Sequence, residues 1–422
     1  MSPGLRLMTD SLRVRNYRLF AGGQVVSLTG TWMQTIGQDW LVLQLSGNSG
    51  TALGIVTALQ FTPTIFLTLY GGVLADRVDK RRMLIVVQFA TGVLALGMGL
   101  LVVSGAAVLW HVYVLALLLG VARAFDVPTR QAFVSELVGP DLLPNAVALN
   151  SATFNTARIV GPAIGGLVIA WLGVGPAFLL NAVSFAAVIA ALWRMDPTEL
   201  FRGPVTLRGP GQVREGLRYV WGRQDLMMVT VLMLVVGTLG MNFNLTLPLL
   251  ARAEFGVGAA QFGLLSTAFA AGALCGALLG TRRRTRPRAT VMLGFAAVFG
   301  LLEIVIAFAP SFLAAAVLLV PTGAFLIAGN NAANSRMQLG ADPALRGRVM
   351  ALYMLVFMGG TAVGAPIMGA ICEAYGVRSG LVLGGAATLV AAAVLAAARV
   401  WRYRPRDRRG HPQQEAAVAA GS

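Results

Sequence analysis

Acidic residues inside long apolar segments are the first candidates for chemistry in this sequence. Of 17 aspartates and glutamates, only Asp39 and Glu303 lie clearly within such segments, and Asp126 and Glu373 lie at their edges. An ionisable group inside a membrane is costly, so each one is a functional hypothesis. A carboxylate at Asp39 would be able to bind a proton and a cationic or polar molecule alternately. The alternative for Asp39 is a solvated side chain in the outer membrane interface, beside an aromatic belt.

Amide side chains within the apolar segments form a second group of candidates. Gln34 and Gln38 lie on the same segment as Asp39, while Asn242 and Asn330 lie in two later segments. These amides are placed either to line a cavity between helices or to form hydrogen bonds from helix to helix. The same alternative applies to Glu303, in the middle of its segment.

Two arginines inside apolar segments need partners there. Arg123 precedes Asp126 by three residues, a spacing compatible with an ion pair within one helix. Snorkelling of the Arg123 side chain toward the membrane surface is the alternative. Arg158 comes shortly before a run of small residues that begins at Gly161.

Residue sets typical of enzymes and metal sites are absent from the sequence. The two histidines, His111 and His411, and the two cysteines, Cys275 and Cys372, show no metal-ligand spacing. No phosphate-binding loop of the form G-x-x-x-x-G-K-[ST] occurs, which argues against direct use of ATP. We therefore expect no catalytic residues, no metal and no cofactor, with a proton gradient as the energy source.

The composition indicates which elements must position these residues. Of 422 residues, 57% are hydrophobic and only 12% are charged, which no soluble core accommodates. At roughly 20 residues per membrane span, this apolar content is enough for about twelve helical spans. A soluble enzyme, a secreted module and a receptor with one anchor are excluded. The net charge of +16 has a source in loop arginines, so it does not indicate a nucleic-acid partner.

Twelve apolar segments are separated by short polar breaks, and the arginine-rich breaks alternate with uncharged ones. The predicted spans are 19–43, 51–75, 84–103, 109–128, 146–171, 177–193, 226–250, 261–280, 289–309, 312–333, 349–371 and 380–399. Of the 33 lysines and arginines, Arg252 and Arg378 fall on one side and Arg123 and Arg158 within spans; all others lie on the opposite side. The positive-inside rule then predicts that both termini are cytoplasmic.

The longest polar stretch divides the chain into two halves. We predict a six-helix half at 1–193, a cytoplasmic linker at 194–225, a second half at 226–400 and a basic tail at 401–422. Gly72-x-Leu74-x-Asp76 recurs 204 residues later as Gly276-x-Leu278-x-Gly280, and Gly161-Pro162-x-x-Gly165 recurs at the same spacing as Ala365-Pro366-x-x-Gly369. A duplicated six-helix unit is one of the designs of membrane transporters.

Two motifs resemble those of the major facilitator superfamily, and the resemblance extends over essentially the whole chain. Residues 72–82, which include Gly72, Asp76, Arg77, Lys80 and Arg81, resemble the signature G-x-L-A-D-R-x-G-R-K/R, except that Asp79 replaces a glycine. Residues 158–166, with Arg158, Gly161, Pro162, Gly165 and Gly166, resemble the fifth-span motif of exporting branches. Trp32-Met-Gln-Thr, residues 128–150 and residues 345–353 are similar to the group that holds enterobactin exporters, transmembrane secretion effectors and macrolide-efflux proteins.

The resemblance implies an all-α membrane protein of two pseudo-symmetric six-helix halves that works by alternating access. It implies that Asp76, with the basic residues after it, latches the two halves at the start of span eleven, near Gly347. The alternative is that these charges only set the topology. It makes Arg123 a candidate for proton transfer. It associates the fifth-span motif with the direction of transport, and close packing of small residues is the overlapping alternative.

The expected function is export of a small organic molecule, such as a drug, an antibiotic or a siderophore, by a proton-coupled antiporter in a bacterial inner membrane. We expect membrane lipids as the other partner, no nucleic acid, and a monomer. Proton symport that imports a metabolite is one alternative. A membrane scaffold or sensor without transport is the alternative from another class, and it has no need of an acid at Asp39.

Overall fold

The computed structural model describes residues 10–201, 212–281, 287–343 and 345–403, and this part of the chain is helical, without β-strands. The first helix bundle contains α2 (Arg15–Ser46), α3 (Gly50–Arg77), α4 (Lys80–Val103), α5 (Leu109–Leu172) and α6 (Val174–Trp193), preceded by the short 3-10 helix η1 (Asp10–Arg13). α5 is 64 residues long and bends at Gly139, whose φ of 68° lies in the region that glycine adopts readily. The bend allows α5 to make the two passes predicted at 109–128 and 146–171.

The second helix bundle follows a short 3-10 helix, η2 (Pro197–Glu199), and the amphipathic helix α7 (Gln212–Trp221). Its first pass is interrupted and consists of α8 (Gln224–Val235), the π-helical turn η3 (Val236–Gly240), α9 (Phe243–Leu249) and a second π-helical turn, η4 (Leu250–Glu254). The remaining passes are α10 (Ala259–Thr281), α11 (Ala289–Ala307), α12 (Phe312–Gly340), α13 (Arg346–Tyr375) and α14 (Val377–Tyr403).

Ten helical segments in the described ranges are long and apolar enough to cross a membrane. This set includes α5 as one segment and leaves out α2, which carries Gln24, Gln34, Gln38 and Asp39 along its length. The twelve predicted spans correspond to the ten segments once α5 is taken as two passes and α2 as one. The all-helical membrane architecture predicted from the sequence is therefore confirmed.

Short polar residues begin several of these helices. Oγ of Ser49 accepts a hydrogen bond from the backbone N–H of Ala52 at the start of α3. Oδ1 of Asp79 accepts one of 2.9 Å from the N–H of Arg82 at the start of α4. N-terminal caps of this kind satisfy backbone donors that have no partner in the helix. Asp79, which departs from the superfamily signature, thus acts as a helix cap.

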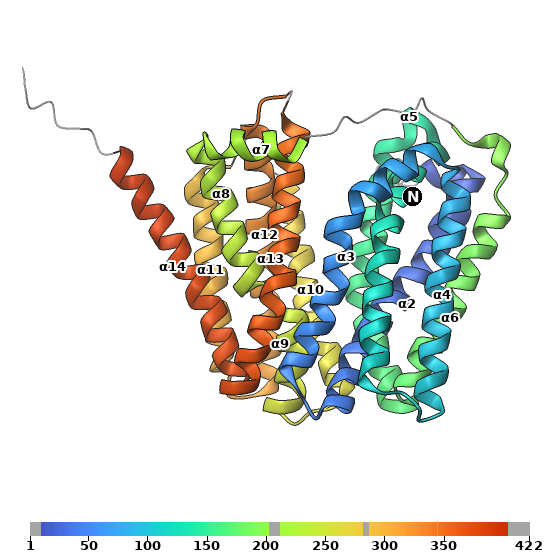
Figure 1. Cartoon of the computed structure of the whole chain (residues 1–422), viewed down its shortest axis with the longest axis horizontal. Helices are drawn as coiled ribbons and strands as arrows, with labels where there is room; N and C mark the ends of the chain where they lie inside the picture. The colour runs from blue at the N-terminus through green and yellow to red at the C-terminus, as the bar shows by residue number, and fades with distance from the viewer. Residues whose placement is uncertain (1–9, 202–211, 282–286, 344, 404–422) are drawn as a thin grey trace, which may run out of the picture.

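The two bundles stand side by side and meet at one end (Figure 1). α7 lies across the upper end of the second bundle in this view. We call the upper end of both bundles the arginine-rich end, because residues 77–82, 287–288 and 346–348 lie there. The other end is called the closed end. α3 packs against α13 and α5 packs against α10, and these are the main contacts between the bundles.

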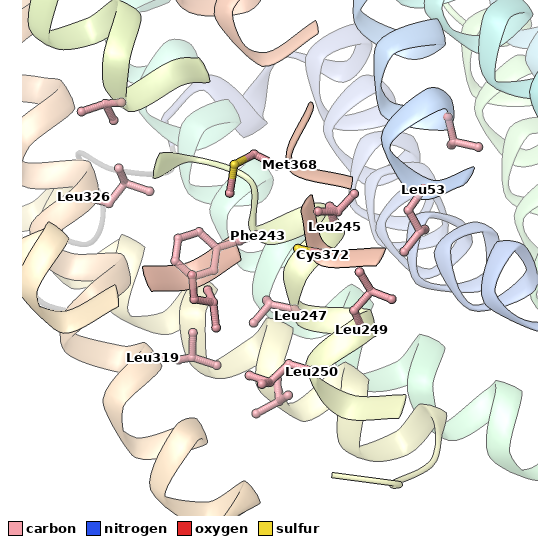
Figure 2. Packing of buried hydrophobic residues seen from close by; sticks show 14 of the residues in the cluster. Leu53, Phe243, Leu245, Leu247, Leu249, Leu250, Leu319, Leu326, Met368 and Cys372 are labelled. Carbon is pink, nitrogen blue, oxygen red and sulfur yellow. The ribbon is translucent and has the colours of Figure 1, made fainter. Parts of the chain in front are cut away.

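The buried hydrophobic residues show the same asymmetry between the ends. One cluster joins both bundles near the closed end, where Leu53 of α3 lies beside Leu249 of the second bundle and Cys372 of α13 (Figure 2). A separate cluster around Phe20, Leu84 and Phe133 belongs to the first bundle alone. Apolar burial therefore holds the bundles together at the closed end.

Exposed tryptophans mark both ends of the helices. Trp110 and Trp171 lie at the closed end, while Trp193, Trp221 and Trp401 lie at the arginine-rich end, and all five are at least 60% exposed. Tryptophan is enriched where the apolar membrane interior meets water. The two levels therefore fit the two surfaces of a membrane.

Candidate functional site

The contact between α3 and α13 is made by backbone atoms. A methyl group added to Gly54 would lie 2.5 Å from the carbonyl oxygen of Ala365, and one added to Gly50 would lie 2.6 Å from that of Gly369. Real Cβ atoms do not approach an oxygen so closely, so only glycine lets these two helices touch. Small residues allow the same close approach between helices in other membrane proteins.

A carboxylate bridges the two bundles beside this contact. Oε2 of Glu373, near the end of α13, accepts hydrogen bonds from Oγ of Ser49 at 2.7 Å and from the backbone N–H of Thr51 at 2.9 Å. The negative charge lies at the N-terminus of α3, where the helix dipole favours it. In the sequence, Glu373 was only an acid at the edge of a predicted span. Its bridging role was not predicted, because its hydrogen-bond partners lie more than 300 residues away in the sequence.

The predicted fifth-span motif forms the second contact between the bundles. A methyl group on Gly166 would lie 2.7 Å from the carbonyl oxygen of Ala259 in α10, and Gly263 lies against the carbonyl oxygen of Pro162. Gly161 and Gly165 instead face α2, where they meet Trp32 and Met33. The motif thus packs one helix against two others, once within its bundle and once across to the other bundle.

Arg158 lies in the same helix and is half-buried. Its Nε atom is buried without a hydrogen-bond partner among the described residues. Nearby, the Thr267 hydroxyl of α10 donates to the Ile159 carbonyl at 3.0 Å, which adds a polar link between the bundles.

Asp39, Gln38 and Gln34 are buried on α2, at 8%, 1% and 5% exposure. Gln34 accepts a hydrogen bond of 2.6 Å from Asn181 of α6, so it joins two helices. The Nε2 atom of Gln38 has no partner, and Asp39 forms no hydrogen bond or ion pair with any residue that the structure describes. The burial of Asp39 does not agree with a solvated surface residue.

Aromatic and cationic groups from the second bundle cover the residue next to Asp39. The Trp40 ring stacks on Phe262 of α10, with ring centres 6.2 Å apart and 19° between the planes. The guanidinium of Arg252, in η4, lies 5.0 Å from the centre of the Trp40 ring. In the sequence, Arg252 was notable only as one of the two basic residues placed on the side opposite to the arginine-rich loops. Its approach to Trp40 places the Asp39 segment at the junction of the bundles.

The described residues show no close ion pair between Arg123 and Asp126, the pairing that their spacing allows. Oδ2 of Asp126 forms an ion pair with Arg130, one helical turn later. Oδ1 of Asp126 accepts a hydrogen bond of 2.9 Å from Nε2 of Gln88 in α4. Arg130 also bonds to Oε1 of Gln24 in α2. Arg123 is exposed on α5, and Arg130, not Arg123, makes the close contact with the Asp126 carboxylate.

These four residues form a buried polar network that joins α2, α4 and α5: Gln24, Gln88, Asp126 and Arg130. Both charged side chains are 16% exposed. This network was not predicted from the sequence, although the spacing of four residues between Asp126 and Arg130 is a signal for a pair on one helix face.

The basic residues of the superfamily signature stay within the first bundle. Nζ of Lys80 pairs with Oε1 of Glu136 in α5 at 2.7 Å. Arg81 donates to the backbone carbonyls of Leu192 at 2.7 Å and Trp193 at 2.9 Å. Both carbonyls lie at the C-terminal end of α6, where the helix supplies few backbone donors. Lys80 and Arg81 thus tie α4 to its neighbours.

The remaining signature residues are Gly72, Asp76 and Arg77. Gly72 is half-buried and Arg77 is exposed, and the side chain of Asp76 lies outside the part that the structure describes. The predicted latch at Asp76 therefore stays a prediction. In the first bundle, Gly71 of α3 meets the carbonyl of Ala124 in α5, and in the second bundle, Gly276 of α10 meets that of Ala324 in α12. The structural counterpart of Gly276 is thus Gly71, one residue before the glycine that the sequence repeat suggests.

The predicted amides of the second bundle are buried. Asn242 is 4% exposed and donates its amide to the carbonyls of Thr238 and Leu239, at 3.0 and 3.1 Å. Oδ1 of Asn330 is buried beside a cavity of about 10 Å³ and has no hydrogen-bond partner within the described ranges. Among the described residues, no three histidine, cysteine or acidic side chains group as they would around a metal ion.

Comparison with known proteins places this arrangement in a family. The profile of the family described as transmembrane secretion effector matches residues 10–418. The multidrug efflux pump Tap of Mycobacterium tuberculosis is 29% identical over 372 residues, which cover 84% of this chain and 86% of Tap. The enterobactin exporter EntS of Shigella flexneri is 25% identical over 342 residues and 78% of each chain. The crystal structure of the nucleoside transporter NupG superposes with a TM-score of 0.72 at 13% identity, over 93% of this chain and all of NupG.

Proposed function

Because the chain belongs to the transmembrane secretion effector family of the major facilitator superfamily, we propose that it is a proton-coupled exporter of small organic molecules. The efflux pump and the siderophore exporter among its relatives support a substrate that is a drug-like or siderophore-like molecule. The apolar composition supports lipophilic substrates over sugars or phosphates. We propose a monomer with no cofactor, in contact with membrane lipids.

The proposed orientation follows from charge. Arginine-rich loops favour the cytoplasmic side of a bacterial inner membrane, so the arginine-rich end is assigned to the cytoplasm. The bundles touch at the other end, through α3 with α13 and α5 with α10. In this orientation the arrangement corresponds to the state that is closed to the outside and loads its substrate from the cytoplasm.

The observation that carries the proposal is the burial of Asp39, without a partner among the described residues, at the junction of the two bundles. A carboxylate there would exchange a proton for a polar or cationic group of the substrate when the bundles rock apart at the closed end. In an antiporter, protonation from the outside would release the substrate and return the carrier to the loading state. Asp76 is proposed to stabilise the opposite, outward-open state from the cytoplasmic side.

Substrate export from an efflux-deficient bacterial host tests the proposal. The wild type is compared with Asp39→Asn at equal membrane expression, with and without a protonophore, against lipophilic antibiotics and siderophores. Glu199→Gln, a change at an exposed acid in the linker region, is the matched control. We expect protection by the wild type and the control, and loss of protection with Asp39→Asn or the protonophore.

The outcomes separate the alternatives. Protection that survives both treatments would remove Asp39 from the coupling mechanism. Uptake of substrate into right-side-out vesicles, rather than into inverted ones, would indicate import by symport. Indifference of every measured property to Asp39→Asn would support a scaffold or sensor.

A further inference from the structure

The first pass of the second bundle is broken at its centre. Between α8 and α9, the π-helical turn Val236–Gly240 is followed by Met241 (φ −97°, ψ 50°) and Asn242 (φ −106°, ψ 30°), neither of which is helical. Asn242 donates its amide to the carbonyls of Thr238 and Leu239, so it holds the break in place. Its own Oδ1 atom is buried without a partner in the part of the chain that the structure describes.

A buried carboxylate faces this break from α11. Glu303 is 2% exposed, and its Oε2 atom has no hydrogen-bond partner among the described residues. A methyl group on Gly384 would lie 2.6 Å from the Leu239 carbonyl oxygen and 2.8 Å from Oε1 of Glu303. One on Gly240 would lie 2.7 Å from Oγ1 of Thr388 and 3.7 Å from Oε2 of Glu303. Two glycines thus allow oxygen atoms from α11, α14 and the break to approach one another closely.

These oxygen atoms include several without partners. Oγ1 of Thr388, which is fully buried, forms no hydrogen bond with any described residue, and the same holds for Oε2 of Glu303 and Oδ1 of Asn242. Leaving such groups unpaired in the interior is costly, and a bare carboxylate is the most costly of them. The site therefore has one negative charge and several oxygen ligands, and lacks a positive group.

No described cation on the surrounding helices supplies that group. On α12, Arg336 donates to the Pro287 carbonyl at 2.6 Å, near the arginine-rich end. On α14, Arg378 pairs with Glu254 at 2.6 Å and Arg399 lies near the other end of the helix. The one acid of α8, Asp225, lies in its first turn, where Arg223 pairs with it. The ionisable groups of these helices thus lie toward the helix ends, away from Glu303.

We propose that Glu303, Thr388 and the Leu239 carbonyl form a binding site for one monovalent cation, either a proton or a sodium ion. A single positive charge neutralises the single carboxylate, whereas a divalent ion would leave an excess charge. Oxygen ligands suit a hard cation, and unwound backbone at a broken membrane helix is a recurring place for such ions. The proposal concerns an ion site in the second bundle and rests on neither Asp39 nor the identity of the substrate.

The first bundle differs at this point. Asp126, a partly buried acid of that bundle, is paired with Arg130, so unlike Asp39 and Glu303 it has a countercharge among the described residues. The carboxylate of Glu303 has no such arginine, and its ion has to come and go. The break beside it would respond to that exchange, because the cation would bind the Leu239 carbonyl that Asn242 also holds.

Thermal unfolding of the purified chain in lipid nanodiscs tests the site without any transported substrate. Unfolding is followed from mildly acidic to mildly alkaline pH in potassium chloride, and again with sodium added. We expect the wild type to lose stability as the pH rises without sodium, since Glu303 is then ionised without a partner. Recovery on addition of sodium assigns a sodium site, and no recovery assigns a proton site. Glu303→Gln, which imitates a neutralised carboxyl, should remove the response to pH and sodium alike.

Two further variants keep the test decisive. Thr388→Val removes one oxygen ligand and keeps the shape of the side chain. For a sodium site, it should raise the sodium concentration needed for stabilisation about tenfold. For a proton site, it should leave the response to pH unchanged. Glu254→Gln, at an exposed acid, is the control and should behave like the wild type. A wild type that responds to neither ion, or a Glu303→Gln variant that folds and responds as the wild type does, overturns the proposal. Neither result depends on whether the chain exports anything.

Discussion

Gly54 and Ala365 come from different bundles, and a methyl group on Gly54 would lie 2.5 Å from the Ala365 carbonyl oxygen. On the other side of the junction, Gly263 meets the carbonyl of Pro162 in the same way. The pairs join α3 to α13 and α5 to α10, which have corresponding places in the two bundles. In each pair, a glycine of one bundle lies against a backbone carbonyl at or next to a proline in a helix of the other bundle. The contacts that close this end of the molecule are therefore pseudo-symmetric. A larger side chain at either glycine would prevent it.

Substitution Gly54→Leu should therefore open the closed end. Cys372, which is 5% exposed and has its Cβ 3.3 Å from a methyl group placed on Gly50, is a natural reporter of this change. With Cys275 replaced by serine, we expect labelling of Cys372 by a membrane-impermeant maleimide to accelerate roughly tenfold or more, equivalent to about 1.4 kcal/mol. Gly294→Leu is the control, because nothing lies within 4 Å of a methyl group at Gly294. Equal labelling of both variants would contradict the assignment of the gate.

Glu373→Gln should weaken the same closure more mildly. The change removes the charge that accepts hydrogen bonds from Ser49 and Thr51, while it keeps the size of the side chain. For a partly solvated carboxylate we expect a loss of about 1 kcal/mol, and so about fivefold faster labelling of Cys372. Glu254→Gln removes an acid at the same end that pairs within the second bundle, with Arg378. If that control accelerates labelling as much, the effect is one of surface charge and not of the bridge.

Arg130 should matter more for stability than Arg123. Replacing Arg130 with glutamine leaves Asp126 buried without its countercharge, at an expected cost of about 3–5 kcal/mol. Arg123→Gln changes an exposed side chain and should cost less than about 0.5 kcal/mol. Thermal unfolding of the two variants in detergent compares them directly. The double variant Asp126→Asn with Arg130→Gln should recover part of the loss, and failure to do so would mean that Arg130 acts mainly through Gln24.

The helices were predictable because membrane spans are long and their hydropathy is a local property. The fusion of two predicted spans into α5 depends on the path of the chain around Gly139, and the break in the predicted span 226–250 was not expected either. Pairing was less predictable, since Asp126 has arginines three residues before and four residues after it. Both spacings place an arginine beside Asp126 on the helix surface, so spacing alone does not decide between them. The bridge from Glu373 to Ser49 and the approach of Arg252 to Trp40 depend on contacts between distant segments, for which a single sequence holds no local signal.

Asn242 and Asn244, two residues apart, should respond very differently to substitution by alanine. The Asn242 amide satisfies the carbonyls of Thr238 and Leu239 at the break, whereas Asn244 is exposed. Inside a membrane protein no bulk water replaces a lost donor, so Asn242→Ala should destabilise the chain by about 1–3 kcal/mol. Asn244→Ala should change stability by less than about 0.5 kcal/mol. Thermal unfolding in nanodiscs measures both, and an Asn242→Ala variant as stable as the wild type would mean that the break is held by packing alone.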